Sequence, residues 1–360
     1  MNNRFEHGGN IYKINREYGI IETDIIDFSA NINPLGMSEL GKAAYINALN
    51  MVVNYPDPEY IKLKDSISNY HNIRSDNLFI GNGAIEMIYK TFDYIKPGAA
   101  LVIAPTFVEY ERALNRIGVI PDFYILKEED NFIVNIEQLK SHAANYDLIV
   151  ICSPNNPTGK LVEKEKIVEF LRFVEENNLE CKLFLDEAFI DFISEEESMI
   201  DKIHEYKNLF ILRSATKFFA IPGLRIGYLI SSNKNLRNFY ENQHIPWSIN
   251  TVAEEVLIAS LSDKDYIERT VSINRSSRIY LYEELSRMHD LKVYQSKGSY
   301  ILFKLLKNVD LRALLLDKSI LIRSCGNYIG LDNSYYRVAV KSHEQNVILV
   351  KAIEEVLSND

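Results

Sequence analysis

One segment of the 360-residue chain combines a lysine in a small polar turn with an arginine shortly after it. Residues 213–228 read Arg-Ser-Ala-Thr-Lys-Phe-Phe-Ala-Ile-Pro-Gly-Leu-Arg-Ile-Gly-Tyr, with the lysine at 217 and the arginine at 225. A lysine forms an imine only when its amine is partly deprotonated, and burial or a nearby cation lowers its pKa in that direction. Although most lysines are solvated surface groups, this pattern predicts that Lys217 holds an aldehyde cofactor and that Arg225 holds its phosphate.

Two further positions lie where strands are expected to end. The turn Gly81-Asn82-Gly83-Ala84 follows an apolar run and opens a helical segment, so its backbone N–H groups can approach an anion, although such a turn is often merely tight. Asp186 ends the apolar run 182–185, at the edge of a parallel sheet where ligands bind. Its carboxylate either caps the next helix or keeps a pyridine nitrogen protonated, because an adjacent anion raises the pKa of a cationic acid.

Four more side chains are candidates for ligand contacts. Asn156 lies in the turn cluster 153–159, where it either braces the loop or donates to a phenolate oxygen. Phe107 follows the apolar run 100–104 and either lies flat on an aromatic cofactor or packs in the core. Arg323 and Arg337 are expected on short strands. They are either solvated or salt-bridged, or they capture a carboxylate or phosphate through paired hydrogen bonds.

Composition excludes several classes of protein. The net charge of −10 without a basic run argues against nucleic-acid binding. Cys152, Cys181 and Cys325 are odd in number and widely spaced, so we expect no disulfide framework and a reducing cytoplasm. We also expect no metal site, because the histidines and cysteines lack metal-ligand spacing. The chain shows neither an apolar leader nor a stretch of about 18 apolar residues, so we expect an unexported protein that does not cross a membrane.

Short apolar runs alternate with amphipathic segments in the first part of the chain, which predicts an α/β fold with a mostly parallel central sheet flanked by helices. The expected strands are 78–80, 100–104, 148–152, 182–185, 209–212 and 227–231. From about residue 251, long helices at 253–262 and 264–288 are followed by short strands at 300–303, 320–323 and 336–340. We expect a large domain at 35–250, and a smaller α+β domain formed by 251–360 together with an N-terminal arm at 1–34.

Taken together, these elements resemble the pyridoxal-phosphate enzymes of the aspartate-aminotransferase fold, fold type I. The resemblance covers the whole chain and rests on the order and approximate spacing of Gly81, Phe107, Asn156, Asp186, Ser214, Lys217 and Arg225. It implies pyridoxal 5'-phosphate as cofactor and a homodimer with shared active sites. It also argues against a regulator of this fold, which would carry a DNA-binding domain ahead of it.

The resemblance assigns catalytic roles to three residues. Lys217 carries the cofactor, Asp186 pairs with its ring nitrogen, and Asn156 contacts its ring hydroxyl oxygen. Phe107 stacks on the ring, and Tyr55 reaches the phosphate from the partner subunit. The remaining cofactor-binding residues hold the phosphate: Gly83, Ala84, Ser214, Thr216 and Arg225.

Within that fold, several motifs resemble the threonine-phosphate decarboxylases: residues 7–10, 27–36, 186–192, 246–250 and 320–328. This implies decarboxylation of L-threonine O-3-phosphate to (R)-1-aminopropan-2-ol O-phosphate in cobalamin biosynthesis. The alternative is a histidinol-phosphate aminotransferase, which shares the core residues. Phe189 stands where the wider family has a tyrosine that donates to the ring oxygen. By the same resemblance, six residues bind the substrate's phosphate and carboxylate: His7, Gly8, Asn31, Asn156, Arg323 and Arg337.

Overall fold

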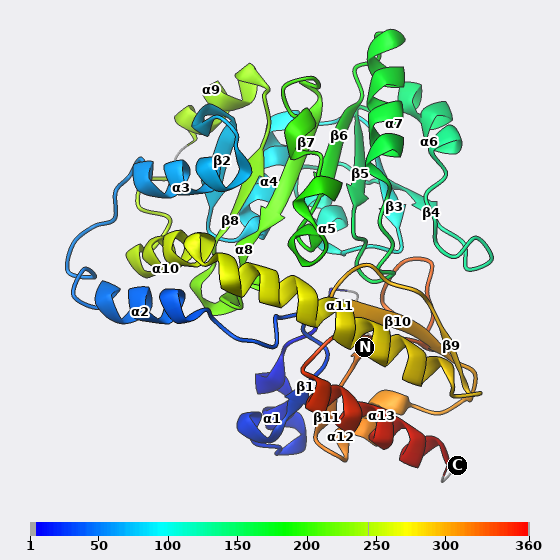
Figure 1. Ribbon diagram of the computed structural model, residues 1–360. Coiled ribbons are helices and arrows are strands. Elements are labelled where there is room, and N and C mark those ends of the chain that lie inside the picture. The colour runs from blue at the N-terminus through cyan, green and yellow to red at the C-terminus, as the bar shows by residue number, and fades with distance from the viewer. Residues whose placement is uncertain (1–4, 244, 359–360) are drawn as a thin grey trace.

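A seven-stranded, mostly parallel sheet forms the centre of the larger part of the molecule (Figure 1). The structure is a computed structural model that describes residues 5–243 and 245–358. The strand order is β2-β8-β7-β6-β5-β3-β4, and β8 runs antiparallel to both of its neighbours. The strands are β2 (Leu78–Gly81), β3 (Ala100–Ala104), β4 (Asp122–Ile125), β5 (Leu148–Cys152), β6 (Lys182–Asp186), β7 (Leu209–Ser214) and β8 (Gly227–Ile230). The expected fold class is confirmed.

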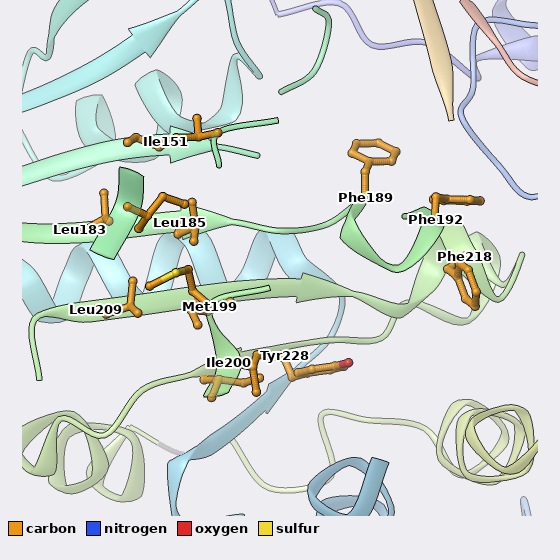
Figure 2. Close-up of a cluster of buried hydrophobic side chains, with 14 of the residues drawn as sticks. Ile151, Leu183, Leu185, Phe189, Phe192, Met199, Ile200, Leu209, Phe218 and Tyr228 are labelled. Carbon is orange, nitrogen blue, oxygen red and sulfur yellow. The ribbon is translucent and has the colours of Figure 1, made fainter. Parts of the chain in front are cut away.

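Helices cover both faces of this sheet. On one face α4 and α5 pack around Phe92, Leu148 and Phe184. On the other, Ile151, Leu183, Leu185 and Leu209 project from three neighbouring strands into one apolar layer (Figure 2). The apolar runs are buried on both faces because helices cover each side, as is usual for parallel sheets. The helices of this part are α2 (Glu39–Ala48), α3 (Ile61–His71), α4 (Ala84–Ile95), α5 (Glu109–Arg116), α6 (Ile136–His142), α7 (Lys164–Glu176), α8 (Ala215–Phe218), α9 (Lys234–Asn242) and α10 (Thr251–Ser262).

A four-stranded antiparallel sheet of order β12-β13-β10-β9 has a separate apolar core. Its strands are β9 (Leu291–Val293), β10 (Tyr300–Leu305), β12 (Arg323–Ser324) and β13 (Tyr335–Ala339), and its helices are α11 (Lys264–Ser286), α12 (Leu311–Leu316) and α13 (His343–Ser358). The N-terminal segment joins this unit, because β1 (Ile26–Asp27) pairs with β11 (Ile320–Leu321) and Phe28 lies fully buried in the same core. Helix α1 (Ile11–Tyr18) precedes it. The domain boundaries at 35 and 250 stay a prediction.

The structure differs from the expected elements in several places. The strand expected at 320–323 is divided: β11 pairs in parallel with β1, whereas β12 pairs with β13 in the other sheet. The edge strand β4 was not among the expected strands, and its side chains are partly or fully exposed although it contains the apolar residues 123–125. None of the described helices is long and apolar enough to cross a membrane.

A buried charged cluster lies directly behind the ends of β6 and β7. The guanidinium of Arg213 is fully buried and faces three carboxylates, with Nε 3.8 Å from Glu187 Oε2 and Nη1 3.5 Å from Asp191 Oδ1, while Nη2 donates to Glu195. Burial raises the pKa of Glu187 to about 7, although the charge of Arg213 acts in the opposite direction. The cluster links the loop after β6 to the end of β7. Asp186 and Ser214, the last residues of these two strands, lie next to the linked segments.

Replacing this arginine tests how strongly the cluster stabilises the fold. Arg213→Leu leaves buried carboxylates without a partner cation, and we expect it to lower the free energy of unfolding by about 3–5 kcal/mol. Urea denaturation followed by circular dichroism measures the change. The matched control is Arg74→Leu, since Arg74 is an exposed side chain paired with Asp76, and its loss should cost at most about 1 kcal/mol. Equal effects of the two substitutions would contradict a stabilising role for the cluster.

Candidate active site

A cavity of about 260 Å³ opens at the carboxyl ends of three parallel strands. Cys152, Asp186 and Ser214 are the last residues of β5, β6 and β7, and all three line it. The carboxyl edge of a parallel sheet is where α/β proteins bind ligands. The wall is completed by the N-terminal segment, the starts of α4 and α5, and residues of the smaller unit. The predicted site residues that line it are His7, Gly8, Asn31, Ala84, Phe107, Asn156, Asp186, Ser214, Thr216, Lys217, Arg225 and Arg337.

Lys217 lies in the short helix α8, immediately after β7. Desolvation lowers the pKa of its amine to about 8, and the nearby cations Arg225 and Arg337 act in the same direction. The negative charge of Asp186 opposes this shift. A larger fraction of this amine is therefore neutral near pH 7 than for an ordinary lysine, as nucleophilic attack on a carbonyl requires.

Asp186 is a buried carboxylate with both oxygens in hydrogen bonds. Tyr110 donates its hydroxyl to Oδ2, and the backbone N–H of Ala188 donates to Oδ1 at 2.8 Å. Burial raises the pKa of Asp186 to about 6, and these two hydrogen bonds and Lys217 limit the rise. At pH 7 the group is mostly ionised and poorly solvated, so it favours a cationic partner in the cavity. Tyr110, the second residue of α5, was not among the predicted site residues. Its position three residues after Phe107 is the sequence feature that could have indicated it.

The end of the cavity near α4 is built to receive an anion. Gly83 adopts φ +82° at the start of α4, and a Cβ there would lie 2.5 Å from Arg225 Nη2. Gly83 does not line the cavity itself, but it lets the guanidinium lie against the helix start. The hydroxyls of Ser214 and Thr216 are hydrogen-bonded at 2.8 Å on the same wall. A helix N-terminus, a guanidinium and two hydroxyls together suit a phosphate.

The amide of Asn156 is oriented by its neighbours. Arg337 Nη1 donates to Asn156 Oδ1, and the Tyr328 hydroxyl donates to the same oxygen at 3.4 Å. A guanidinium cannot accept a hydrogen bond, so the atom facing it must be the amide oxygen. The NH2 group is left to donate elsewhere, and Asn156 lines the cavity.

Two buried polar atoms near this amide have no hydrogen-bond partner among the described residues: Asn31 Oδ1 and Arg337 Nε. Buried polar atoms are usually paired, so each is a candidate contact for a ligand. Both residues line the cavity. They add a second set of polar groups to the cavity wall.

Besides Gly83, two predicted site residues lie outside the cavity lining. Tyr55 is 80% exposed, and its ring lies 4.8 Å from that of Trp247. Arg323 is buried, and its Nη2 donates to the backbone oxygen of Glu6 at 2.6 Å and to Asn327 Oδ1 at 2.7 Å. Its guanidinium lies 5.5 Å from the ring centre of Tyr328. Tyr328 itself lines the cavity and was missed, as were Tyr110, Cys152 and Ser29.

Comparisons with known proteins agree on one family. A family model described as "Aminotransferase class I and II" matches residues 23–353. The threonine-phosphate decarboxylase of Salmonella typhimurium is 37% identical over 98% of this chain and 96% of its own. A second relative is the adenosylcobalamin biosynthesis bifunctional protein CobDQ of Leptospira interrogans, with 32% identity. The match covers 98% of this chain and 41% of that protein. The solved structure of the histidinol-phosphate aminotransferase from Clostridium acetobutylicum is similar with a TM-score of 0.87 and 34% identity, covering 92% of this chain and 99% of that one.

The titration of Lys217 is directly measurable. In dialysed protein, labelling of this amine by trinitrobenzenesulfonate should reach half its maximum near pH 8, because only the neutral amine reacts. Arg225→Met removes a cation that disfavours the ammonium form, so the midpoint should move to higher pH. Peptide mass spectrometry measures labelling at position 217. Arg237→Met serves as the control, since Arg237 lies away from the cavity lining and pairs with Asp76. Midpoints that are the same in all three proteins would contradict the proposed influence of Arg225.

Proposed function

The chain belongs to the aminotransferase class I and II family, and from this premise we propose that it is a pyridoxal-phosphate decarboxylase of L-threonine O-3-phosphate. The products are (R)-1-aminopropan-2-ol O-phosphate and carbon dioxide. The observation that carries the choice of reaction is the nearly full-length, 37% identical threonine-phosphate decarboxylase. The 32% identical bifunctional protein of adenosylcobalamin biosynthesis supports a place in that pathway.

The cavity fits pyridoxal phosphate in its chemistry. The start of α4 at Gly83 and Ala84, with Ser214, Thr216 and Arg225, would hold the phosphate. Lys217, with its lowered pKa, would hold the aldehyde carbon, and Phe107 would lie against the ring. The ionised, desolvated Asp186 would keep the ring nitrogen protonated, and the oriented amide of Asn156 would donate to the ring oxygen.

When bound, pyridoxal phosphate provides an electron-withdrawing ring that stabilises the electron pair left at Cα when carbon dioxide departs. Asp186 supports this role, because a carboxylate held by Tyr110 and Ala188 stabilises positive charge on the adjacent ring nitrogen. The carboxylate carbon leaves as carbon dioxide, its bonding electrons stay at Cα, and one proton must reach that carbon. The amine of Lys217, once protonated, would be a suitable donor of that proton.

The residues that bind the substrate would determine which bond to Cα breaks. The orientation in which they hold the substrate would favour loss of either the carboxylate or the hydrogen from Cα, and so either decarboxylation or amino transfer. We assign the substrate's phosphate and carboxylate to His7, Gly8, Asn31, Asn156, Arg323 and Arg337. The unpaired donor Arg337 Nε supports this assignment. Arg323 lies next to the ring of Tyr328 and outside the cavity lining. A direct contact between Arg323 and the substrate would require the segment around Glu6 to shift.

A second candidate function is supported by one specific observation. The 34% identical solved structure is a histidinol-phosphate aminotransferase. That reaction requires the same cofactor-holding residues, so the core of the site does not separate the two. The decarboxylase has the more similar full-length relative, at 37% identity.

The two reactions are separated by one pair of assays. We expect the purified holoenzyme to release carbon dioxide from L-threonine O-3-phosphate and to form no glutamate from 2-oxoglutarate supplied with histidinol phosphate. Coupled carboxylase and glutamate dehydrogenase assays measure the two products. Lys217→Ala should lower the decarboxylation rate by at least about 1,000-fold, because it removes both the cofactor link and the proton donor. Glutamate without carbon dioxide would establish the aminotransferase instead.

We further propose a cytoplasmic homodimer that shares its active sites. The three cysteines are free and buried, which suits a reducing compartment.

Exposed apolar side chains gather on α2, on the loop after it and at the start of α3, and such a concentration is typical of an interface. They are Leu40, Tyr45, Ile46, Leu49, Met51, Val52, Val53, Tyr55 and Ile61. Tyr55 lies in this patch, so a partner subunit covering it would bring the hydroxyl toward the partner's cavity.

Mixed dimers test whether Tyr55 acts across the interface. Lys217→Ala and Tyr55→Ala chains are each expected to be poorly active alone. When the two are coexpressed, random pairing makes half of the dimers mixed, and each mixed dimer has one intact site of two. We therefore expect about one quarter of wild-type decarboxylation, measured on the purified mixture. Activity equal to the mean of the two parents would rule out a shared site, and each parent coexpressed with itself is the control.

A further inference from the structure

The N-terminal segment contributes one titratable side chain, His7, to the cavity wall. Its ring Nε2 lies 2.8 Å from Oε1 of Glu109, and its ring centre lies 5.6 Å from that of Phe107. The side chain is 42% exposed, so the surrounding packing leaves it partly free. The contact with Glu109 is therefore the main polar restraint that the structure shows on this ring.

Glu109 is the first residue of α5 and is buried. Besides His7, its carboxylate accepts from the hydroxyl of Tyr89 at 3.0 Å and from Arg112 Nη1 at 3.4 Å. Burial alone would raise its pKa, but the hydrogen bonds from His7 and Tyr89, together with the charges of His7 and Arg112, hold the pKa below the usual value. Glu109 is thus an ionised acceptor at neutral pH, held in place by groups other than the histidine.

The chemistry of this contact determines how the ring is presented. An ionised carboxylate only accepts hydrogen bonds, so His7 Nε2 must be the donor. The second nitrogen, Nδ1, lies on another edge of the same rigid ring. It donates to an anion when the ring is an imidazolium, because both nitrogens then carry N–H groups. Carboxylates orient histidines toward metal ions in this way, by binding one nitrogen and thereby fixing the other.

The backbone of the segment is held by separate contacts. Arg323 Nη2 donates to the backbone oxygen of Glu6, and the N–H of Gly9 donates to Ser29 Oγ at 2.7 Å. Gly8 packs so closely that a Cβ there would lie 2.2 Å from the Ser29 carbonyl oxygen. These contacts do not involve Glu109. Loss of its carboxylate should therefore free the ring of His7 while leaving the segment in place.

We infer that Glu109 is a positioning residue for the substrate's anionic end: it holds His7 so that the ring presents its second nitrogen to a phosphate or carboxylate in the cavity. The inference rests on the proposed function only for the identity of the substrate. Arg337 and Gly8 line the same cavity as His7 and add a cation and backbone to its wall, which suits an oxyanion.

The experiment uses Glu109→Gln, which keeps the shape of the side chain and removes its charge. For the holoenzyme acting on L-threonine O-3-phosphate, we expect KM to rise roughly tenfold while kcat changes by less than about twofold, since a hydrogen bond to a charged group is lost at a binding contact. His7→Ala should have a similar effect. The double variant should be no worse than His7→Ala alone, because Glu109 acts through His7.

Glu111→Gln is the matched control, because it makes the same substitution on the same helix at a residue outside the cavity lining. Its KM should stay within about twofold of wild type. An equal rise in KM for both variants would mean that the effect is a general one on α5. An unchanged KM in Glu109→Gln, or effects of His7→Ala and Glu109→Gln that multiply in the double variant, would overturn the inference.

Binding of inorganic phosphate to the holoenzyme, measured by calorimetry, separates this inference from the proposed function. Glu109→Gln and His7→Ala should weaken phosphate binding equally, and the double variant no further. If the wild type releases no carbon dioxide but the variants weaken phosphate binding in this way, the result contradicts the proposed reaction and supports the role of Glu109. If carbon dioxide is released and Glu109→Gln binds phosphate as the wild type does, the result supports the reaction and contradicts the role of Glu109.

Discussion

The desolvation of two opposite charges in one cavity is the constraint on which the rest of the site depends. Burial moves the pKa of Lys217 down to about 8 and that of Asp186 up to about 6. Each group partly restrains the shift of the other. The protein holds both because β6 and β7 run in parallel and end side by side, and because the buried Arg213 cluster ties the segments that follow them. A poorly solvated carboxylate and a readily deprotonated amine are the pair that a cationic, aldehyde-bearing ring requires.

Arg337 connects this centre to the rest of the molecule. From β13 of the smaller unit, it donates to Asn156, in the loop after β5, and to the Ser29 carbonyl of the N-terminal segment. It therefore orients the amide and restrains the segment that carries His7, and its charge lowers the pKa of Lys217. Buried guanidiniums are costly unless they are paired. Here two of the nitrogens are satisfied by protein and Nε is left without a described partner, which leaves an unpaired donor on a residue of the cavity wall.

The sequence predicts best what depends on local pattern. Runs buried on both faces, such as Ala100–Ala104 and Leu148–Cys152, are found with their correct bounds, whereas the partly exposed edge strand β4 lacks such a run. The site residues carried over from the resemblance mostly line one cavity. Tyr110 was missed because its role depends on Asp186, 76 residues away. Arg323 and Arg337 follow the same sequence pattern and are register partners on adjacent strands. Their contacts nevertheless differ, because Arg323 donates to Glu6, 317 residues away, whereas Arg337 donates to Asn156 and Ser29. Such distant partners cannot be predicted from a local sequence pattern.

These differences locate reaction choice in the molecule. The cofactor end is formed by strand ends and by the starts of α4 and α8, elements fixed by the backbone hydrogen bonds of one sheet. The residues proposed to bind the substrate, among them His7, Asn31 and Arg337, come from the N-terminal segment and the smaller sheet. A side-chain contact with Glu109 joins this segment to α5, and one with Arg323 joins it to the smaller sheet. Under the proposed function, changes in those contacts would redirect a bound carboxylate without altering Lys217 or Asp186. Because substrate orientation separates decarboxylation from amino transfer, the same core would then serve either reaction.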